Sequence, residues 1–190
     1  MRARMALKLA GVEVEIREIS LRDKPTHMLQ VSPKATVPVL VLVDGAVIEE
    51  SIEIMLFALK NHALGANIHA PSRAHDFKKL VSENDGDFKQ ALDAYKYPER
   101  FPNKTQTQHR ADGEVFLQKL ENQLNQHQYL FGEATSLADI AIFPFVRQFA
   151  AVDESWWQTR PYPKLHVWLS GWLSSDLFNS VMTKSPTFID

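Results

Sequence analysis

The first sixty residues change their hydrophobic pattern several times. Residues 1–10 are good helix formers and stop at a glycine, so they predict a helix. Apolar and polar side chains then alternate over residues 12–17, a pattern that predicts a strand with one buried face. A polar turn follows, and a short helix is expected at about 26–31, where a Ser-Pro-Lys sequence ends it.

A hairpin and another helix come next. The apolar run 39–43 faces 46–48 across Asp44-Gly45, a dipeptide that strongly favours a two-residue hairpin turn. Ser51 then opens a helix, because apolar residues recur after it with helical spacing. The predicted apolar face of this helix consists of Ile52, Met55, Leu56 and Leu59.

The rest of the chain has a helical pattern. Residues 61–71 are irregular and contain glycine and proline, so they are expected to form a linker. The later helices are predicted at about 72–96, 104–127, 137–151 and 163–175. The predicted fold class is therefore α/β plus all-α, with a small α/β domain at 1–60 and a helical domain at 72–190.

Composition excludes several function classes. The 190 residues are 45% hydrophobic and 23% charged with a net charge of -2, which is typical of a globular protein. Charge is also balanced within residues 1–60 and within the rest of the chain, which argues against binding to nucleic acid or to an anionic membrane. No apolar run reaches the roughly 18 residues of a membrane span and no signal peptide is apparent, so a cytoplasmic location is expected.

Pro38 interrupts the apolar run and needs an explanation. Proline cannot donate to a sheet, so it fits either as the first residue of an edge strand or in a cis Val37-Pro38 bond. A cis bond would turn the Val37 backbone towards a ligand, but only about 5–6% of X-Pro bonds are cis. The proline alone favours the trans arrangement.

Glu50 and Ser51 form the second candidate pair. A helix N-terminus presents free N–H groups that suit a carboxylate, and the Ser51 hydroxyl adds a donor. Glu50 beside it can accept from an ammonium group, so the pair suits an α-amino acid head group. The alternative is that Ser51 is only an N-cap, and the serine taken alone favours this alternative.

Together these residues carry a family resemblance. The stretch KATVPVLVLVDGAVIEES resembles the thioredoxin-like domain of the glutathione S-transferase family. The resemblance implies that Val37-Pro38 is cis and pairs with the cysteinyl part of glutathione, and that Glu50 and Ser51 bind the γ-glutamyl head. It also implies that Lys24 lies near the glycyl carboxylate.

The helical half carries a second matching motif. TSLADIAIFPFV resembles the capping box of the family's buried central helix, in which Ser136 is the cap and Asp139 reaches back to it. The family further implies glutathione as co-substrate, a small electrophilic or disulfide second substrate, and a homodimer.

The resemblance fails at the N-terminus. In the family the first strand and a loop with the catalytic Cys, Ser or Tyr precede the first helix, whereas this chain starts with that helix. The thioredoxin-like domain is therefore expected to be incomplete and the catalytic residue is unknown. The chain contains no cysteine, so little or no transferase or thiol-reductase activity is expected from it as written. The alternative function is a non-catalytic binding or scaffolding protein.

Other candidate residues are weighed against packing roles. The seven histidines show no metal-ligand spacing, so no metal site is expected. Tyr95 and Tyr97 are candidates to replace the missing catalytic hydroxyl or to face a second substrate, with core packing as the stronger alternative. Trp156 and Trp157 are expected to pack or to line a cleft.

Overall fold

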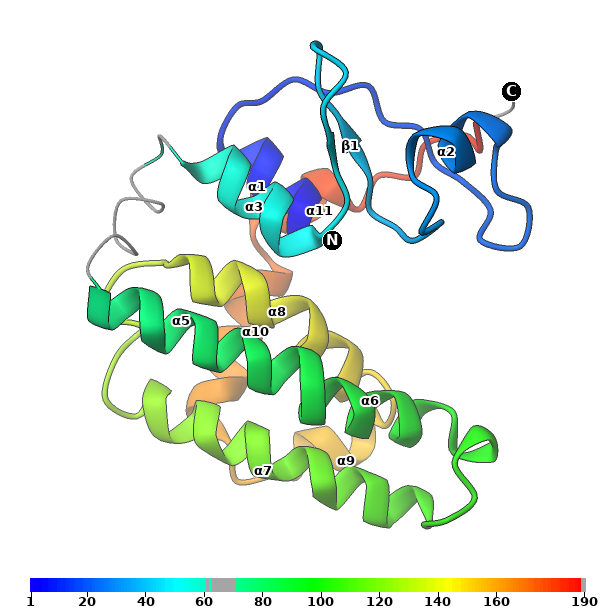
Figure 1. The fold of residues 1–190 in the computed structure, drawn as a ribbon. Helices are drawn as coiled ribbons and strands as arrows, with labels where there is room; N and C mark the ends of the chain where they lie inside the picture. The colour runs from blue at the N-terminus through cyan, green and yellow to red at the C-terminus, as the bar shows by residue number, and fades with distance from the viewer. Residues whose placement is uncertain (61, 63–70, 189–190) are drawn as a thin grey trace. The chain divides into compact units, whose positions relative to one another are not determined.

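The structure is a computed structural model that describes residues 1–60, 62 and 71–188 (Figure 1). The chain divides into two compact units, of which one comprises 1–65 together with 176–190 and the other comprises 66–175. The expected helical domain ran to residue 190, but the C-terminal residues from Asp176 belong to the first unit. The expected linker, 61–71, lies outside the described residues except for 62 and 71.

The first unit is built on two helices and a hairpin. Helix α1 (Arg2–Leu9) packs against α3 (Ser51–Leu59), and their contact forms a small apolar core. The core contains Ala3, Leu7 and Ile54, with Leu40, Ile48 and Ala58 packed against it. Helices this short are not stable alone in water, and the burial of apolar surface between them stabilises both.

The buried face of α3 differs from the predicted one. Ile54, Met55 and Leu59 are buried, whereas Leu56 is exposed and Ile52 is half-buried. The apolar spacing therefore predicted the helix correctly, but it assigned the exposed Leu56 to the buried face and left out Ile54. The choice of face was made by the contact between Ile54 and α1, which the spacing alone does not contain.

The hairpin forms at the predicted turn. Strands β1 (Leu40–Val41) and β2 (Val47–Ile48) pair antiparallel, with Leu40 opposite Ile48. Gly45 has φ 84°, a conformation that favours glycine, and the Asp44 carboxylate accepts from the Ala46 N–H at 3.0 Å. Both strands are shorter than the apolar runs that predicted them.

The predicted strand at 12–17 is wrong. Helix α2 (Thr26–Val31) forms where it was expected, but residues 12–17 have no regular structure and Val12, Val14 and Ile16 are exposed. A strand needs a neighbour to pair with its backbone. Within the described residues this segment is bridged only at its end, where Glu18 pairs parallel with Thr187.

The partner at that bridge is the C-terminal segment. Helix α11 (Asp176–Val181) packs against α1, and the chain after it returns to the segment that follows residue 12. The Phe188 N–H donates to the Glu18 carbonyl at 2.7 Å, and the Arg17 guanidinium lies 4.7 Å from the centre of the Phe188 ring. These contacts explain why the C-terminal residues belong to the first unit.

The second unit is entirely helical in its described part. Its elements are α5 (Pro71–Glu83), the π-helical turn η1 (Asn84–Phe88), α6 (Lys89–Lys96), the 3-10 turn η2 (Pro98–Arg100), α7 (Gln106–Leu124), α8 (Leu137–Ala150), α9 (Glu154–Gln158) and α10 (Pro163–Leu173). Figure 1 shows α5 and α6 as one long rod beside α7. The predicted fold class, a small α/β part followed by a helical part, is confirmed.

Helix α8 is the buried centre of this unit. Its side chains are covered on nearly every side, and a reciprocal capping box between Ser136 and the buried Asp139 closes its N-terminus. Asp139 accepts from the Ser136 N–H at 2.8 Å, as the capping-box motif predicted. Among the described helices, none has the length and apolarity to cross a membrane.

Candidate functional site

The N-terminus of α3 is open. Glu50 is the N-cap, with extended backbone (φ -94°, ψ 135°), and its carbonyl accepts from the Ile54 N–H at 2.9 Å. Ser51 is therefore the first helical residue and not the N-cap of the alternative interpretation. Among the described residues no side chain caps this helix end, so its first N–H groups have no partner there. The half-buried Ser51 hydroxyl stands beside groups that favour an anion.

The loop between α2 and β1 supplies the second part of the site. Its Val37-Pro38 bond is cis, and Val37 is 49% exposed. The described residues provide no hydrogen-bond partner for the Val37 backbone. Its N–H and C=O groups are therefore available to an external chain or ligand.

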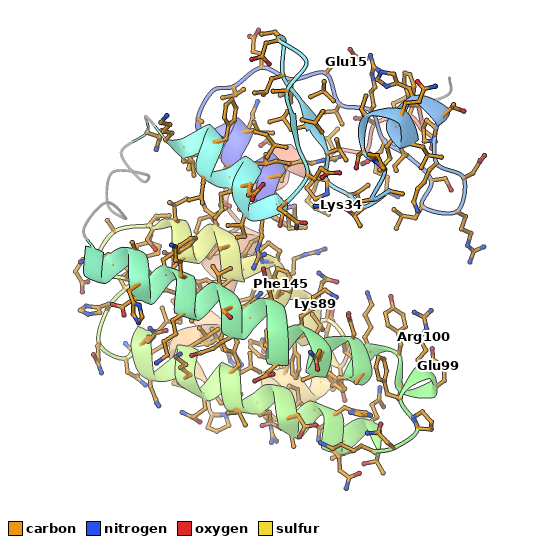
Figure 2. The ribbon with its side chains drawn as sticks, viewed as in Figure 1. Glu15, Lys34, Lys89, Glu99, Arg100 and Phe145 are labelled. Carbon is orange, nitrogen blue, oxygen red and sulfur yellow. The ribbon has the colours of Figure 1, made fainter. Side chains whose placement is uncertain are left out.

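A charged cluster joins this loop to the start of α3. The Ser32 hydroxyl donates to one carboxylate oxygen of Glu49 at 2.7 Å, and the Lys34 ammonium lies 3.3 Å from the other. Lys34 is also 3.8 Å from a Glu50 oxygen. Figure 2 labels Lys34 close to the point where α3 begins. The loop and the helix start thus meet through side chains separated by 17 positions in sequence.

This cluster sets the local electrostatics. The hydrogen bond from Ser32, and secondarily the Lys34 ammonium, hold the pKa of the Glu49 carboxyl below its ordinary value. Glu49 is therefore a carboxylate at neutral pH, and one lysine lies between it and Glu50. The three side chains carry a net charge of about -1, which suits one ammonium group of a ligand.

Glu49 was missed by the sequence analysis. It is the residue before the Glu50-Ser51 pair, and nothing in its local pattern distinguishes it from an exposed acidic residue. Its partner Ser32 ends α2 and is completely buried. Ser32 is itself the serine of the Ser-Pro helix stop, and neither its burial nor its acceptor is visible in the sequence.

Lys24 is the least connected of the predicted site residues. It is half-buried and follows a turn in which the Asp23 N–H donates to the Ser20 carbonyl. No described contact joins Lys24 to Val37, Glu50 or Ser51. The structure therefore brings together the proline loop and the start of α3, and leaves the role of Lys24 a prediction.

The tyrosine candidates in the second unit differ from each other. Tyr95 is 2% exposed and packs between Phe149 and Trp156, with ring centres 4.9 and 6.3 Å away. Burial raises the pKa of the Tyr95 phenol, so the group is both enclosed and reluctant to ionise. Tyr97 is half-buried, and the Arg100 guanidinium lies 4.4 Å from its ring centre. Tyr97 is therefore the accessible hydroxyl of the two.

The tryptophan pair is part of the core. Trp156 and Trp157 are 8% and 5% exposed, and their rings contact each other and neighbouring aromatic side chains. Of the two predicted roles, packing fits these positions. No group of three or more potential metal ligands occurs among the described residues.

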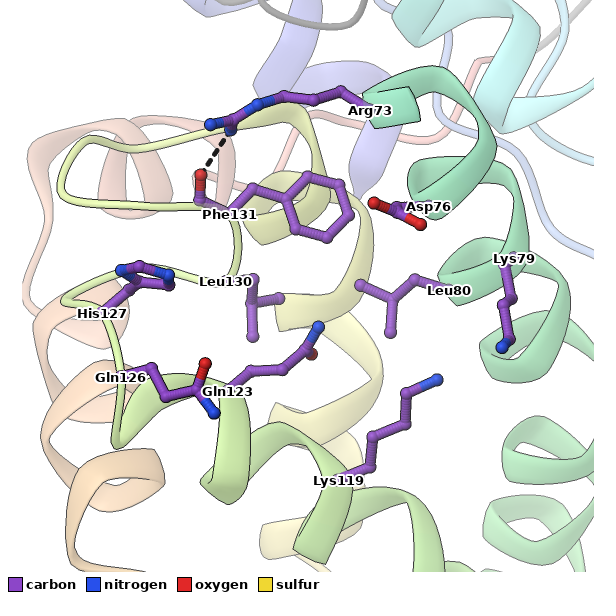
Figure 3. Close-up of a pocket in the computed structure, with 10 residues that line it drawn as sticks. All are labelled: Arg73, Asp76, Lys79, Leu80, Lys119, Gln123, Gln126, His127, Leu130 and Phe131. Carbon is purple, nitrogen blue, oxygen red and sulfur yellow. Dashed lines mark hydrogen bonds between the residues drawn. The ribbon is translucent and has the colours of Figure 1, made fainter. Parts of the chain in front are cut away.

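A hollow of about 490 Å³ lies within the second unit (Figure 3). Its wall includes Arg73, Lys79, Leu80, Lys119, Gln123 and Phe131. Arg73 donates to the Phe131 carbonyl at 2.5 Å, and Lys119 is paired with Glu83. These two cations already have protein partners, so the hollow does not present them to an anionic ligand.

The chain is similar to known proteins over most of its length. The protein-family model for the glutathione S-transferase N-terminal domain matches residues 1–60, and the family model for the C-terminal domain matches residues 74–176. The chain is 28% identical over 176 residues to glutathione S-transferase U19 of Arabidopsis thaliana, covering 89% of this chain and 78% of that protein.

Solved structures share the fold. A ternary complex of BphK, a bacterial GST, matches with a TM-score of 0.76 at 22% identity, covering 95% of this chain and 92% of that one. A glutathione transferase from Burkholderia graminis, with two glutathione molecules bound per subunit, matches with a TM-score of 0.77 at 15% identity, covering 94% and 81%. The two family models between them cover most of the chain, and the chain therefore belongs to the glutathione S-transferase family.

Proposed function

We propose that this chain binds glutathione in its first unit. The γ-glutamyl carboxylate is held by the Ser51 hydroxyl and the free N–H groups of α3, and the adjacent ammonium is held by Glu50. The Val37 backbone pairs with the cysteinyl part, and Lys24 serves the glycyl carboxylate. The observation that carries the proposal is the uncapped N-terminus of α3 beside an exposed carboxylate.

The proposal follows from matching charges. An α-amino acid head group carries an anion and a cation on one carbon, so its site must offer both signs within a short distance. The helix end supplies partial positive charge, and Glu50 supplies the negative charge at the N-cap position. Several structures with the same fold hold glutathione, among them a glutathione transferase homologue from Sulfitobacter, which supports the choice of ligand.

We infer a glutathione S-transferase-like protein whose second substrate is a small electrophile or a disulfide, acting as a cytoplasmic homodimer. A transferase must stabilise the glutathione thiolate, since a free thiol has a pKa near 8.5 and is mostly protonated at neutral pH. Tyr97 is the accessible hydroxyl candidate among the tyrosines considered.

A non-catalytic binding or scaffolding role is the second candidate. It is favoured by the enclosure of Tyr95 and by the absence of cysteine from these 190 residues. Turnover of glutathione with a standard electrophile distinguishes the two candidates. A rate equal to the uncatalysed one, with glutathione affinity retained, favours the binding role, and a rate well above it that is lost in Tyr97→Phe favours the enzyme.

Calorimetric titration with glutathione tests the binding proposal. Ser51→Ala removes one hydrogen bond to a charged group, worth about 1.5–3 kcal/mol, so affinity should fall about tenfold or more. Ser155→Ala is the matched control, because Ser155 is an exposed serine near the start of another helix, α9. Equal affinity in Ser51→Ala and Ser155→Ala contradicts the proposed site, and no heat of binding in the unmodified chain contradicts the proposed ligand.

A further inference from the structure

Two segments that are distant in sequence must keep a fixed position relative to each other for the proposed glutathione site to exist. Val37 lies in the loop after α2, and Ser51 begins α3. The hairpin between them is short, with only two residues in each strand, so it gives limited control over the position of the loop. Side-chain contacts between the loop and the helix start would add to that control.

Glu49 provides that connection with both of its oxygens. Oε1 accepts from the buried Ser32 hydroxyl at 2.7 Å, and Oε2 lies 3.3 Å from the Lys34 ammonium. The side chain of Glu49 is 22% exposed, whereas that of Lys34 is 59% exposed. The Ser32 contact is thus the better shielded of the two, and the Lys34 contact is an ion pair open to solvent.

The second contact affects the neighbouring carboxylate. Lys34 is nearer to Glu49, at 3.3 Å, than to Glu50, at 3.8 Å. If the charge of Glu49 were removed, Glu50 would be the remaining carboxylate within ion-pair distance of the lysine. Lys34 would then compete with a ligand ammonium for the same oxygens.

We propose that Glu49 is a positioning residue of the glutathione head-group site. Through Ser32 it fixes the proline loop against the start of α3, and it holds the Lys34 ammonium nearer to its own oxygen than to that of Glu50, which limits the competition for Glu50. Glu49 itself does not touch the ligand. The proposal rests on the proposed glutathione binding for its second part, but its first part concerns the free protein alone.

A double-mutant cycle measured by calorimetry tests the second part. Glu49→Gln keeps an acceptor for Ser32 but loses the charge that holds Lys34, so glutathione affinity should fall about five- to tenfold. Lys34→Met removes the competing cation, and the double variant should recover to within about twofold of Lys34→Met alone. Such a recovery would show that the lysine causes the loss, because removing a lysine cannot rescue a general loss of structure. A double variant as weak as Glu49→Gln overturns this part.

Glu13→Gln is the control for the loss of one negative charge in the first unit. Glu13 is exposed and lies outside both the cluster and α3, so the affinity of this variant should stay within about twofold of that of the unmodified chain. An equal loss in Glu13→Gln and Glu49→Gln shows a general charge effect and overturns the specific role of Glu49.

Amide hydrogen exchange without ligand tests the first part. Glu49→Ala should speed exchange of the Ser32 and Ala35 amides, which donate to the Met28 and Ser32 carbonyls, while leaving α8 unchanged, since α8 belongs to the other unit. Unchanged exchange in the loop overturns the positioning role whether or not glutathione binds. If the unmodified chain shows no glutathione binding while the loop exchange responds as expected, the proposed function fails and the structural part of this proposal stands.

Discussion

Replacement of Asp139 should destabilise the helical unit more than any surface change. Its carboxylate is completely buried and accepts four hydrogen bonds. One oxygen accepts from the Leu130 N–H at 3.0 Å and from the Trp168 indole N–H at 2.8 Å. The other accepts from the Ser136 N–H at 2.8 Å and from its hydroxyl at 2.6 Å. The single side chain thus links the preceding loop, the start of α8 and helix α10.

The magnitude follows from the donors left behind. Asp139→Ala strands three buried N–H groups, each costing about 1–3 kcal/mol when unsatisfied. The total is below the sum, because burial raises the pKa of Asp139 and so the native carboxylate already bears a desolvation cost. We expect a loss of about 3–5 kcal/mol. Asp139→Asn keeps one accepting oxygen but turns an N–H towards the Ser136 N–H, so about 2–3 kcal/mol is expected.

Denaturant unfolding followed by tryptophan fluorescence measures this loss. All 4 tryptophans lie in the 66–175 unit, so the signal reports that unit. Asp153→Ala is the matched control, because Asp153 is an exposed cap that accepts from the Trp156 N–H at 2.9 Å, and its loss should cost only about 1 kcal/mol. A loss below about 1 kcal/mol for Asp139→Ala would refute the reasoning.

Three further predictions concern stability. Gly113→Ala should cost about 1–3 kcal/mol in the same unfolding assay, because the added Cβ would lie 2.3 Å from the Phe149 ring; a neutral variant would show that the ring moves freely. Burial and the hydrogen bond to Glu114 raise the pKa of Tyr162 to about 12, so the unfolded chain releases this proton first and stability should fall as pH rises above about 10. Tyr162→Phe should flatten that alkaline fall, measured by thermal unfolding across pH, and an unchanged slope contradicts the assignment. Phe188→Ala should lower the free energy of unfolding by about 1 kcal/mol, because it removes the ring that the Arg17 guanidinium covers. Hydrogen exchange near the bridge between Glu18 and Thr187 should rise, and unaltered exchange contradicts the docking of the C-terminal segment.

The sequence predicted elements whose cause is local. The hairpin followed from Asp44-Gly45, and the helix ends followed from periodicity and capping residues such as Ser136. The strand at 12–17 failed because alternation describes a side-chain pattern and does not supply a pairing partner. The short helices α9 and α11 were missed because five or six residues contain too little periodicity.

The site was predictable in part for the same reason. Glu50 and Ser51 are adjacent, so their helix-start chemistry is visible in the sequence. Ser32 and Glu49 meet only when the loop folds back on the helix start, and no local pattern encodes that meeting. The accessible Tyr97 and enclosed Tyr95 could not be separated either, because exposure depends on the packing of α6 against its neighbours.

The central claim, that glutathione binds at the start of α3, is tested most directly by titrating glutathione into the isotope-labelled chain and following backbone amide signals. The account predicts saturable shifts that are largest at the Ser51, Ile52 and Glu53 amides, which lack intrahelical partners, and at Val37. Shifts confined to the 66–175 unit, or no saturable shift at all, would contradict it.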